Sequence, residues 1–192
     1  MTATIIASGN SLRGYKGPFT GHRLFINHTW KYFNFGSGEL DRLICYDRIG
    51  AKEDQGYNSW PYIHTRQKNG GRFKLIGSEF QTEYPSVGNW NTTVAFAINI
   101  AWHWGYRKLY LLGVDGYCGE YFHFYDDKPL NAREQLKQNR MLKGRDGGIG
   151  VNDKILKAAH GFEENGGEVV FVQSEIQDGI TLDDYAGSLA IL

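Results

Sequence analysis

His123 is the residue of this chain best suited to moving a proton. It lies in the aromatic run Tyr121–Tyr125, and two carboxylates, Asp126 and Asp127, follow it closely. A carboxylate beside an imidazole can orient the ring and keep its pKa near neutral, as a general base requires. Asp115 is the competing proton acceptor, and simple packing within the aromatic run is the alternative role of His123. The sequence thus offers two candidate catalytic residues, His123 and Asp115.

Further polar residues lie where apolar segments end. Four short apolar segments predict strands: Thr4–Ala7, Leu24–Asn27, Leu43–Tyr46 and Leu109–Leu112. Polar residues close or follow them, in the order Ser8–Leu12, Asn27, Asp47 and Asp115. In open parallel sheets, ligands bind beyond the carboxyl ends of the strands. We therefore expect these polar residues to share one edge of the sheet and to form a ligand site there.

The run from residue 91 to residue 117 predicts the elements that position this edge. Asn91 or Thr92 can cap a helix, and Gly105 stands where a helix ends in the left-handed conformation. Nearly every side of that helix is apolar, which predicts that it is buried. The strand Leu109–Leu112 is apolar throughout, as in a parallel strand covered on both faces. The pattern favours an α/β fold with a mainly parallel sheet.

The rest of the chain predicts a single domain, residues 1–192, without internal repeats or a linker. Residues 48–90 are broken by glycine and proline, so we expect an irregular insertion there with one or two short strands. Asn131–Lys143 predicts an exposed charged helix. Asn152 or Asp153 can begin another helix that ends before Gly166-Gly167, and Glu168–Val172 predicts the last strand.

Composition excludes several classes of protein. The 192 residues contain 21 Lys plus Arg and 21 Asp plus Glu, so no basic field attracts nucleic acid or anionic lipid. Two cysteines are more typical of reduced intracellular thiols than of a disulfide scaffold. No signal peptide is evident, and no apolar stretch approaches the ~20 residues that span a bilayer. The sequence predicts a cytoplasmic protein without a membrane span.

Signals for metal and nucleophile chemistry are weak. The six histidines have no mutual spacing typical of metal ligands, and the G-x-S-x-G nucleophile motif is missing. The loop Ser8–Leu12 could place backbone amides against an anion, but it lacks both glycine-rich phosphate-binding motifs. Asp115, Asp126 and Asp127 are the only clustered carboxylates that could hold magnesium.

Two parts of the chain together resemble a known family. The first is a strand followed by Gly-Asn-Ser-Leu, then Phe-Ile-Asn27 and Tyr46-Asp47; the second is Asn91-Thr-Thr, a helix, and Gly-Tyr-Arg-Lys-Leu-Tyr-Leu-Leu-Gly-Val-Asp115-Gly-Tyr117. They resemble the bacterial sialyltransferases of glycosyltransferase family 42, which use CMP-sialic acid. They are also similar to motility-associated and hydroxymethylpterin-pyrophosphokinase-like proteins and to uncharacterised phage proteins. The resemblance covers roughly residues 4–47 and 91–127.

The resemblance implies a Rossmann-like, three-layer fold of the sialyltransferase type with a nucleotide in its crevice. By position, Gly9, Asn10 and Ser11 would contact the phosphate and ribose, and Asn27 and Asp47 the ribose or the donor. Thr92 or Thr93 would contact the donor or base. Tyr117 and Tyr121 would contact the leaving phosphate, because their hydroxyls can stabilise its charge without a metal. The family's catalytic histidine has no counterpart, since Gly147-Gly-Ile-Gly150 stands at that place.

The sequence favours one function over two alternatives. The first, which is the leading hypothesis, is a metal-independent glycosyltransferase that needs no cofactor and takes a CMP- or UDP-linked sugar as donor. The second is a phosphotransferase or pyrophosphokinase on the same fold, which would require magnesium. The third is a non-catalytic nucleotide-binding protein. The acceptor and the oligomeric state, a homo-oligomer included, also stay open.

Overall fold

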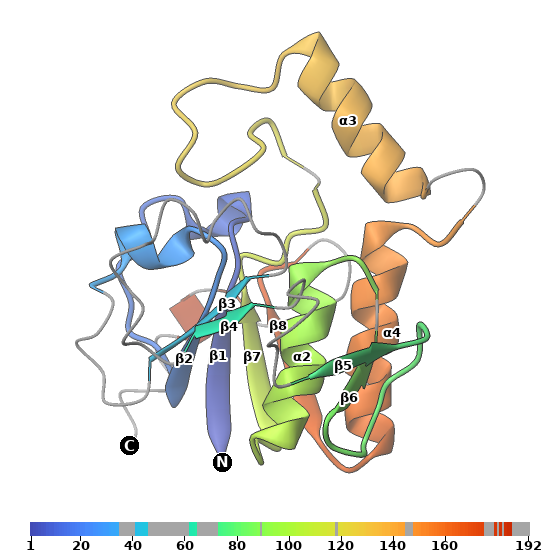
Figure 1. Ribbon diagram of the computed structural model, residues 1–192. Helices are drawn as coiled ribbons and strands as arrows, with labels where there is room; N and C mark the ends of the chain where they lie inside the picture. The colour runs from blue at the N-terminus through green and yellow to red at the C-terminus, as the bar shows by residue number, and fades with distance from the viewer. Residues whose placement is uncertain are drawn as a thin grey trace.

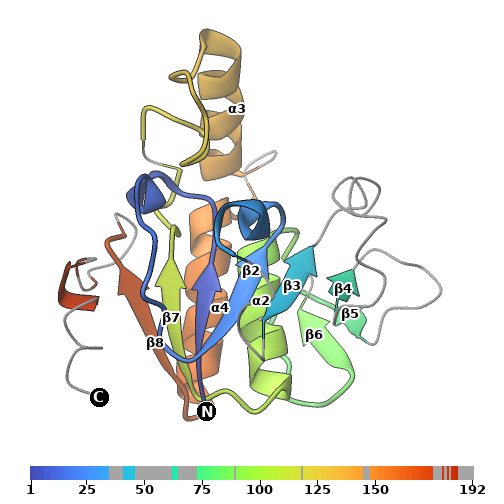
Figure 2. The same ribbon diagram turned by 90° about the vertical axis from the view of Figure 1, so that its left-hand side faces the viewer.

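The computed structural model contains a parallel sheet that fixes the position of the predicted ligand edge. It describes residues 1–34, 41–45, 62–64, 73–88, 90–117, 119–144, 148–174, 179, 181 and 183–185. The six strands of the sheet are β1 (Thr2–Ile6), β2 (His22–Ile26), β3 (Arg42–Cys45), β4 (Tyr62–His64), β7 (Lys108–Leu112) and β8 (Glu168–Val172). Their order is β4-β3-β2-β1-β7-β8, and every neighbouring pair is parallel (Figures 1 and 2).

The strand order reverses beside β1. From β1 the chain proceeds through β2, β3 and β4 toward one edge, and β7 and β8 then occupy the other side of β1. Ile6 at the end of β1 pairs with Phe25 on β2 and with Leu112 on β7. The carboxyl ends of the three central strands are therefore level. In an α/β sheet such a reversal creates a crevice where ligands bind.

The sheet lies between two apolar layers, so the α/β three-layer Rossmann-like fold is confirmed. Helices α2 (Thr93–His103) and α4 (Val151–Glu164) cover one face (Figure 2). The other face packs against Leu12 of the short 3₁₀ helix η1 (Asn10–Leu12), against Phe33 after the 3₁₀ helix η2 (Thr29–Tyr32), and against Tyr185. Alternate strand residues face the two layers, as the period of a strand requires.

The predicted buried helix is α2. Its interior residues from Ala95 to Ala101 are all buried, and Gly105 after it has φ +82°. Thr92 is the N-cap residue, although its side chain makes no capping hydrogen bond. Buried Asn99 accepts hydrogen bonds from the N–H groups of Gln81 and Gly88 and donates to Gln81 O. This one side chain thus ties the segment before α2 to the core.

The segment expected to be irregular, with one or two short strands, contributes three strands to two sheets, so the predicted number was too small. β4 pairs with β3 and extends the main sheet, while β5 (Lys74–Ile76) and β6 (Ser86–Gly88) form a separate two-stranded parallel sheet beside α2. The remaining residues of this segment include long stretches outside the described part. Edge strands as short as these give too few residues for a sequence pattern to establish their partners.

Helix α3 (Ala132–Lys143) stands beyond the carboxyl ends of the strands (Figures 1 and 2). A capping box begins it: Asn131 accepts from the N–H groups of Arg133 and Glu134, and Glu134 accepts from Asn131 N–H. The helix is exposed on most sides, as predicted. It therefore lies over the edge where a ligand would bind.

Helix α4 begins differently from the prediction. Its N-cap residue is Gly150, and Asp153 accepts a hydrogen bond from Gly150 N–H from inside the first turn. Asn152 does not cap the helix; its side-chain amide donates to Gly116 O at 2.9 Å. The sequence interpretation placed the cap two or three residues late, because glycine has no side chain to signal the position.

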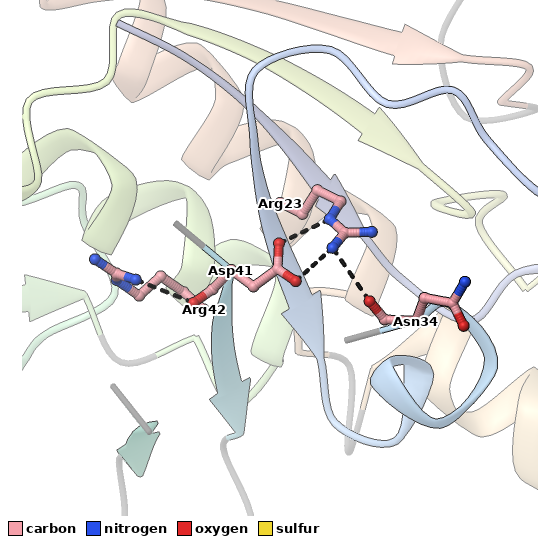
Figure 3. A network of polar contacts seen from close by, with 4 residues as sticks. All are labelled: Arg23, Asn34, Asp41 and Arg42. Atoms are coloured by element: carbon pink, nitrogen blue, oxygen red, sulfur yellow. Dashed lines mark hydrogen bonds and ion pairs between the residues drawn. The ribbon is translucent and has the colours of Figure 1, made fainter. Parts of the chain in front are cut away.

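A polar network joins β2 and β3 near their amino ends. Arg23 Nε donates to Asp41 Oδ1 at 2.7 Å, and its Nη2 also contacts Asp41 and Asn34 O (Figure 3). Arg42 Nη1 donates to Asp41 O at 3.0 Å. The Asp41 side chain is only 2% exposed. This network is remote from the carboxyl edge, so its contribution is to stability rather than to ligand contact.

No helix within the described ranges combines the length and the apolar character that crossing a bilayer requires.

Candidate functional site

A pocket of about 90 Å³ lies at the carboxyl ends of β1, β2 and β7. Eight residues predicted to bind ligand or to do chemistry line it: Gly9, Asn10, Asn27, Thr92, Thr93, Asp115, Tyr117 and Tyr121. They come from the loops after three strands and from the start of α2. The convergence expected from the strand ends is thus present in the structure. The volume is well below the ~300–1,000 Å³ of pockets that enclose a whole ligand, so this pocket suits one part of a larger ligand.

Gly9 is required by the close approach of two loops. Its N–H donates to Gly113 O at 2.7 Å, which joins the loop after β1 to the loop after β7. A Cβ atom on Gly9 would lie 2.5 Å from Gly113 O and 2.5 Å from Asp115 Oδ2. The conformation of Gly9, φ −70°, is open to any residue, so the requirement is for space and not for a special backbone angle.

Asp115 contacts the same loop through its carboxylate. Oδ2 accepts a hydrogen bond from Ser11 N–H at 2.6 Å, and Oδ1 accepts one from the Ser11 hydroxyl at 2.5 Å. Ser11 was expected to meet a phosphate, but its amide and hydroxyl are directed to Asp115, and it does not line the described pocket. The carboxylate occupies the position that an anionic ligand would take. Asp115 therefore organises the loop as well as lining the pocket.

His123 reaches the pocket through another side chain. Its Nδ1 lies 2.9 Å from the hydroxyl oxygen of Ser8, and Ser8 lines the pocket whereas His123 is not among the described lining residues. The main chain reinforces the contact, because Phe124 N–H donates to Ser8 O at 2.9 Å. A hydroxyl and an imidazole at hydrogen-bond distance form the arrangement that activates an alcohol for proton transfer.

Asp126 contacts the main chain of His123, whereas the sequence predicted a contact with its ring. It accepts a hydrogen bond from His123 main-chain N–H at 2.7 Å, and no described contact joins it to the second ring nitrogen. Burial lowers the pKa of His123, Asp126 opposes that effect, and Lys137 and His28 add to it. A neutral imidazole is favoured, and it can accept a proton from the Ser8 hydroxyl.

Some residues that line the pocket have left-handed backbone. Asn27 (φ 54°), Gly113 (φ 66°) and Tyr117 (φ 59°) follow strand ends or lie just beyond them and line the pocket. For a bulky residue such as tyrosine this conformation is strained, and strain of this kind gathers at functional sites. The side chain of Gln138 on α3 donates to Tyr117 O and so holds the residue in place.

Tyr117 keeps its proton. Burial raises the pKa of its hydroxyl, so the group remains a hydrogen-bond donor at neutral pH. Its ring packs against Phe122, with ring centroids 5.6 Å apart. A neutral phenol beside a pocket can donate to a developing negative charge.

Several side-chain oxygens of the pocket-lining residues can accept hydrogen bonds. Asn10 donates from Nδ2 to Tyr121 O at 2.9 Å, which leaves its buried Oδ1 without a hydrogen-bond partner in the described structure. Asn27 Oδ1 lies 3.4 Å from the Thr93 hydroxyl. Asp115 is the single charged residue among the lining residues described. Such a surface recognises hydroxyl and amino groups of a ligand, since these are donors.

The carboxylates proposed for magnesium do not form one set of ligands. Asp115 bonds to Ser11, whereas Asp126 bonds to the main chain of His123. Within the described ranges, no three His, Cys, Asp or Glu side chains gather as metal ligands would. Within the residues that the structure describes, Asp115, Asp126 and Asp127 are therefore not gathered into one set of metal ligands.

Three further residues complete the description. Asp47 lies outside the described residues. Ser8 belongs to the predicted loop Ser8–Leu12, but its contact with His123 was not predicted. Asn152 connects α4 to Gly116 of the pocket, and no sequence signal pointed to that contact.

Comparison of the chain with protein-family models, with curated protein sequences and with solved structures gives no significant match.

Proposed function

We propose that this protein is a metal-independent glycosyltransferase that takes a nucleotide-activated sugar, CMP- or UDP-linked, as its donor. The main support is the pocket at the reversal point of the parallel sheet, lined by eight of the residues that the sequence singled out. The sialyltransferase type of fold belongs to the same proposal. Nucleotides commonly bind at such reversal points.

The hydroxyl-bearing part of the donor enters the pocket. Its lining includes Asp115 and Asn10, whose side-chain oxygens can accept hydrogen bonds from ribose or sugar hydroxyls. This differs from the family-based expectation that the loop at Gly9–Ser11 holds the phosphate. A phosphate beside the Asp115 carboxylate would meet like-charge repulsion.

Transfer exchanges one bond of the sugar carbon, and the net proton movement is from the acceptor to His123 through Ser8. The bond between the sugar carbon and the donor phosphate oxygen breaks as a bond to the acceptor oxygen forms. The acceptor's proton passes to Ser8 Oγ while the Ser8 proton passes to His123 Nδ1, 2.9 Å away. The electron pair of the broken bond stays on the nucleotide phosphate, and the neutral Tyr117 hydroxyl can donate to it.

A ligand screen tests the binding part of the proposal. CMP, UDP, GDP, ADP and their sugar conjugates are compared for their effect on the free energy of unfolding. A ligand of the folded state at a hundredfold excess over Kd stabilises by about 2.7 kcal/mol. Stabilisation by a pyrimidine nucleotide is expected, and the absence of any nucleotide effect would contradict the proposal.

Three variants test the chemistry once a donor is found. His123→Asn is expected to remove the acidic limb of the pH–rate profile, and Ser8→Ala to lower kcat by about 10²–10⁴-fold, the usual range for lost acid–base catalysis. Tyr117→Phe should raise the barrier by about 2.7–4 kcal/mol, as loss of a donor to a developing charge does.

Turnover in EDTA separates this function from a magnesium-dependent phosphotransferase. If the His123→Asn enzyme keeps a near-normal kcat and an unchanged pH profile, Asp115 rather than His123 accepts the proton.

A further inference from the structure

A nucleotide sugar carries negative charge that the pocket itself does not neutralise. Among its described lining residues the single charged group is Asp115, which is negative. The formal net charge of the chain is +0, so no overall field attracts an anion either. A phosphate ligand therefore needs a local cationic group outside the pocket lining.

Two cationic side chains lie over aromatic rings that line the pocket. Arg13 Cζ is 3.9 Å from the ring centroid of Tyr121, and Lys137 Nζ is 4.9 Å from that of Phe122. Both rings line the pocket, and both cations are exposed. A cation over an aromatic face is held by the negative face of the ring.

Arg13 is held in place and retains capacity for a ligand. Its Nη2 donates to Asp126 O at 2.7 Å, and its planar group lies against Tyr121. A guanidinium has five N–H groups, so one main-chain hydrogen bond leaves donors for an anion. Arginine in such a fixed orientation is suited to bidentate contact with phosphate oxygens.

Lys137 is brought over the site by α3. The next residue, Gln138, donates to Tyr117 O, which ties this turn of the helix to the pocket. The charge of Lys137 is also one of the influences that lower the pKa of His123. The ammonium group is therefore close enough to the pocket region to act on the charge of His123. The carboxylate of Asp126 compensates part of this positive charge. It also accepts a hydrogen bond from the main-chain N–H of His123.

We infer that Arg13 and Lys137 form the phosphate-binding part of this site, and that its ligand is a nucleoside phosphate whose hydroxyl-bearing part enters the pocket. The inference rests on the proposed function for the identity of the ligand. In this arrangement the phosphate charge is bound at the rim of the pocket. The two cationic groups come from the loop after η1 and from α3. It predicts that affinity increases with the number of phosphates and decreases with salt.

The test compares nucleosides with their mono- and diphosphates, and with pyrophosphate alone. Cytidine, CMP, CDP, the matching uridine series and inorganic pyrophosphate are titrated by calorimetry at low and at high salt. Arg13→Gln and Lys137→Gln are each expected to weaken the diphosphates about tenfold, equal to ~1.4 kcal/mol, and to leave the nucleosides unchanged. Lys137→Arg keeps the charge and should retain most of the affinity.

Two control variants remove the same charge from the same segments. Lys16→Gln and Arg140→Gln, both at exposed positions, should leave every affinity unchanged. The inference would be overturned if the controls lost as much affinity as the test variants. It would also be overturned if the test variants bound nucleoside phosphates as tightly as the original protein does. In both cases the proposed function would stand. Pyrophosphate binding that depends on Arg13 and Lys137, with no binding of any nucleoside or nucleotide, would support the phosphate site and contradict the proposed donor. A protein that binds none of the probes would refute both.

Discussion

The imidazole of His123 lies against the hydroxyl of Ser8, with Nδ1 2.9 Å from Oγ, although 115 residues separate them in the sequence. The ring is enclosed by Phe122 and Tyr125, whose centroids are 4.8 and 5.0 Å from its own. Three further groups act on its charge: Asp126 favours the protonated form, and Lys137 and His28 oppose it. Burial is the largest influence and favours the neutral ring.

This burial makes stability depend on pH. The pKa of His123 is lowered in the folded protein, whereas an unfolded histidine titrates near about 6.5. Between these two values the unfolded chain binds more protons, so the free energy of unfolding falls as the pH is lowered through that window. His123→Asn should reduce this loss, measured by urea unfolding at several pH values. Burial also lowers the pKa of His103, so part of the dependence of stability on pH should remain in the variant. An identical pH dependence in the variant would show that His123 is not the group responsible.

Asp115 contributes to stability as well as to the pocket. In Asp115→Asn the charge is lost, and the NH₂ that replaces one carboxylate oxygen cannot accept the hydrogen bond that Ser11 now donates to that oxygen. We expect a loss of about 1–3 kcal/mol, the usual cost of leaving a partly buried polar group unsatisfied. Ser11→Ala should cost less, because its backbone hydrogen bond remains. Asp127→Asn, at an exposed position, is the control in the same urea titration. Equal stability of Asp115→Asn and the control would show that the contact contributes little.

Gly9→Ala should disrupt the pocket through crowding alone. Its new Cβ would lie 2.5 Å from Gly113 O and from Asp115 Oδ2, so one of the two loops must move. Nucleotide binding is expected to be lost. Gly14→Ala is the matched variant: its φ of +80° imposes strain of about 1–2 kcal/mol, but no atom lies within 4 Å of the added methyl. Calorimetric titration should show binding by Gly14→Ala only. Unimpaired binding by Gly9→Ala would mean that the loops can separate freely.

The strands and the site edge were predictable from the sequence because they depend on local patterns. β7 was recognised from its uninterrupted apolar residues, and the burial of α2 from apolar residues on all its sides. The convergence of Gly9, Asn27 and Asp115 followed from one rule, that parallel strands end at a common edge. Such predictions need only the direction of each strand.

The contacts between side chains were not predictable in the same way. That Asp115 bonds to Ser11, and that Asp126 contacts the main chain of His123 rather than its ring, depends on how two loops cross. Neither loop has a periodic pattern that fixes the direction of its side chains. The bond from Asn152 to Gly116 likewise depends on where α4 begins, which a glycine cap concealed.

The ion pair of Arg23 and Asp41 should be one of the most sensitive points of the fold. Their side chains are 14% and 2% exposed, and Arg23 Nε donates to Asp41 Oδ1 at 2.7 Å (Figure 3). Asp41→Asn removes the negative charge that lies against a largely buried guanidinium, a change that typically costs about 3–5 kcal/mol. Glu79→Gln breaks an exposed pair with Lys157 and should cost only about 0–1 kcal/mol in the same urea titration. The double variant Arg23→Met, Asp41→Leu removes both charges and should recover much of the lost stability, because neither partner is left unpaired. A double variant as unstable as Asp41→Asn would show that the loss arises from the other hydrogen bonds of the network.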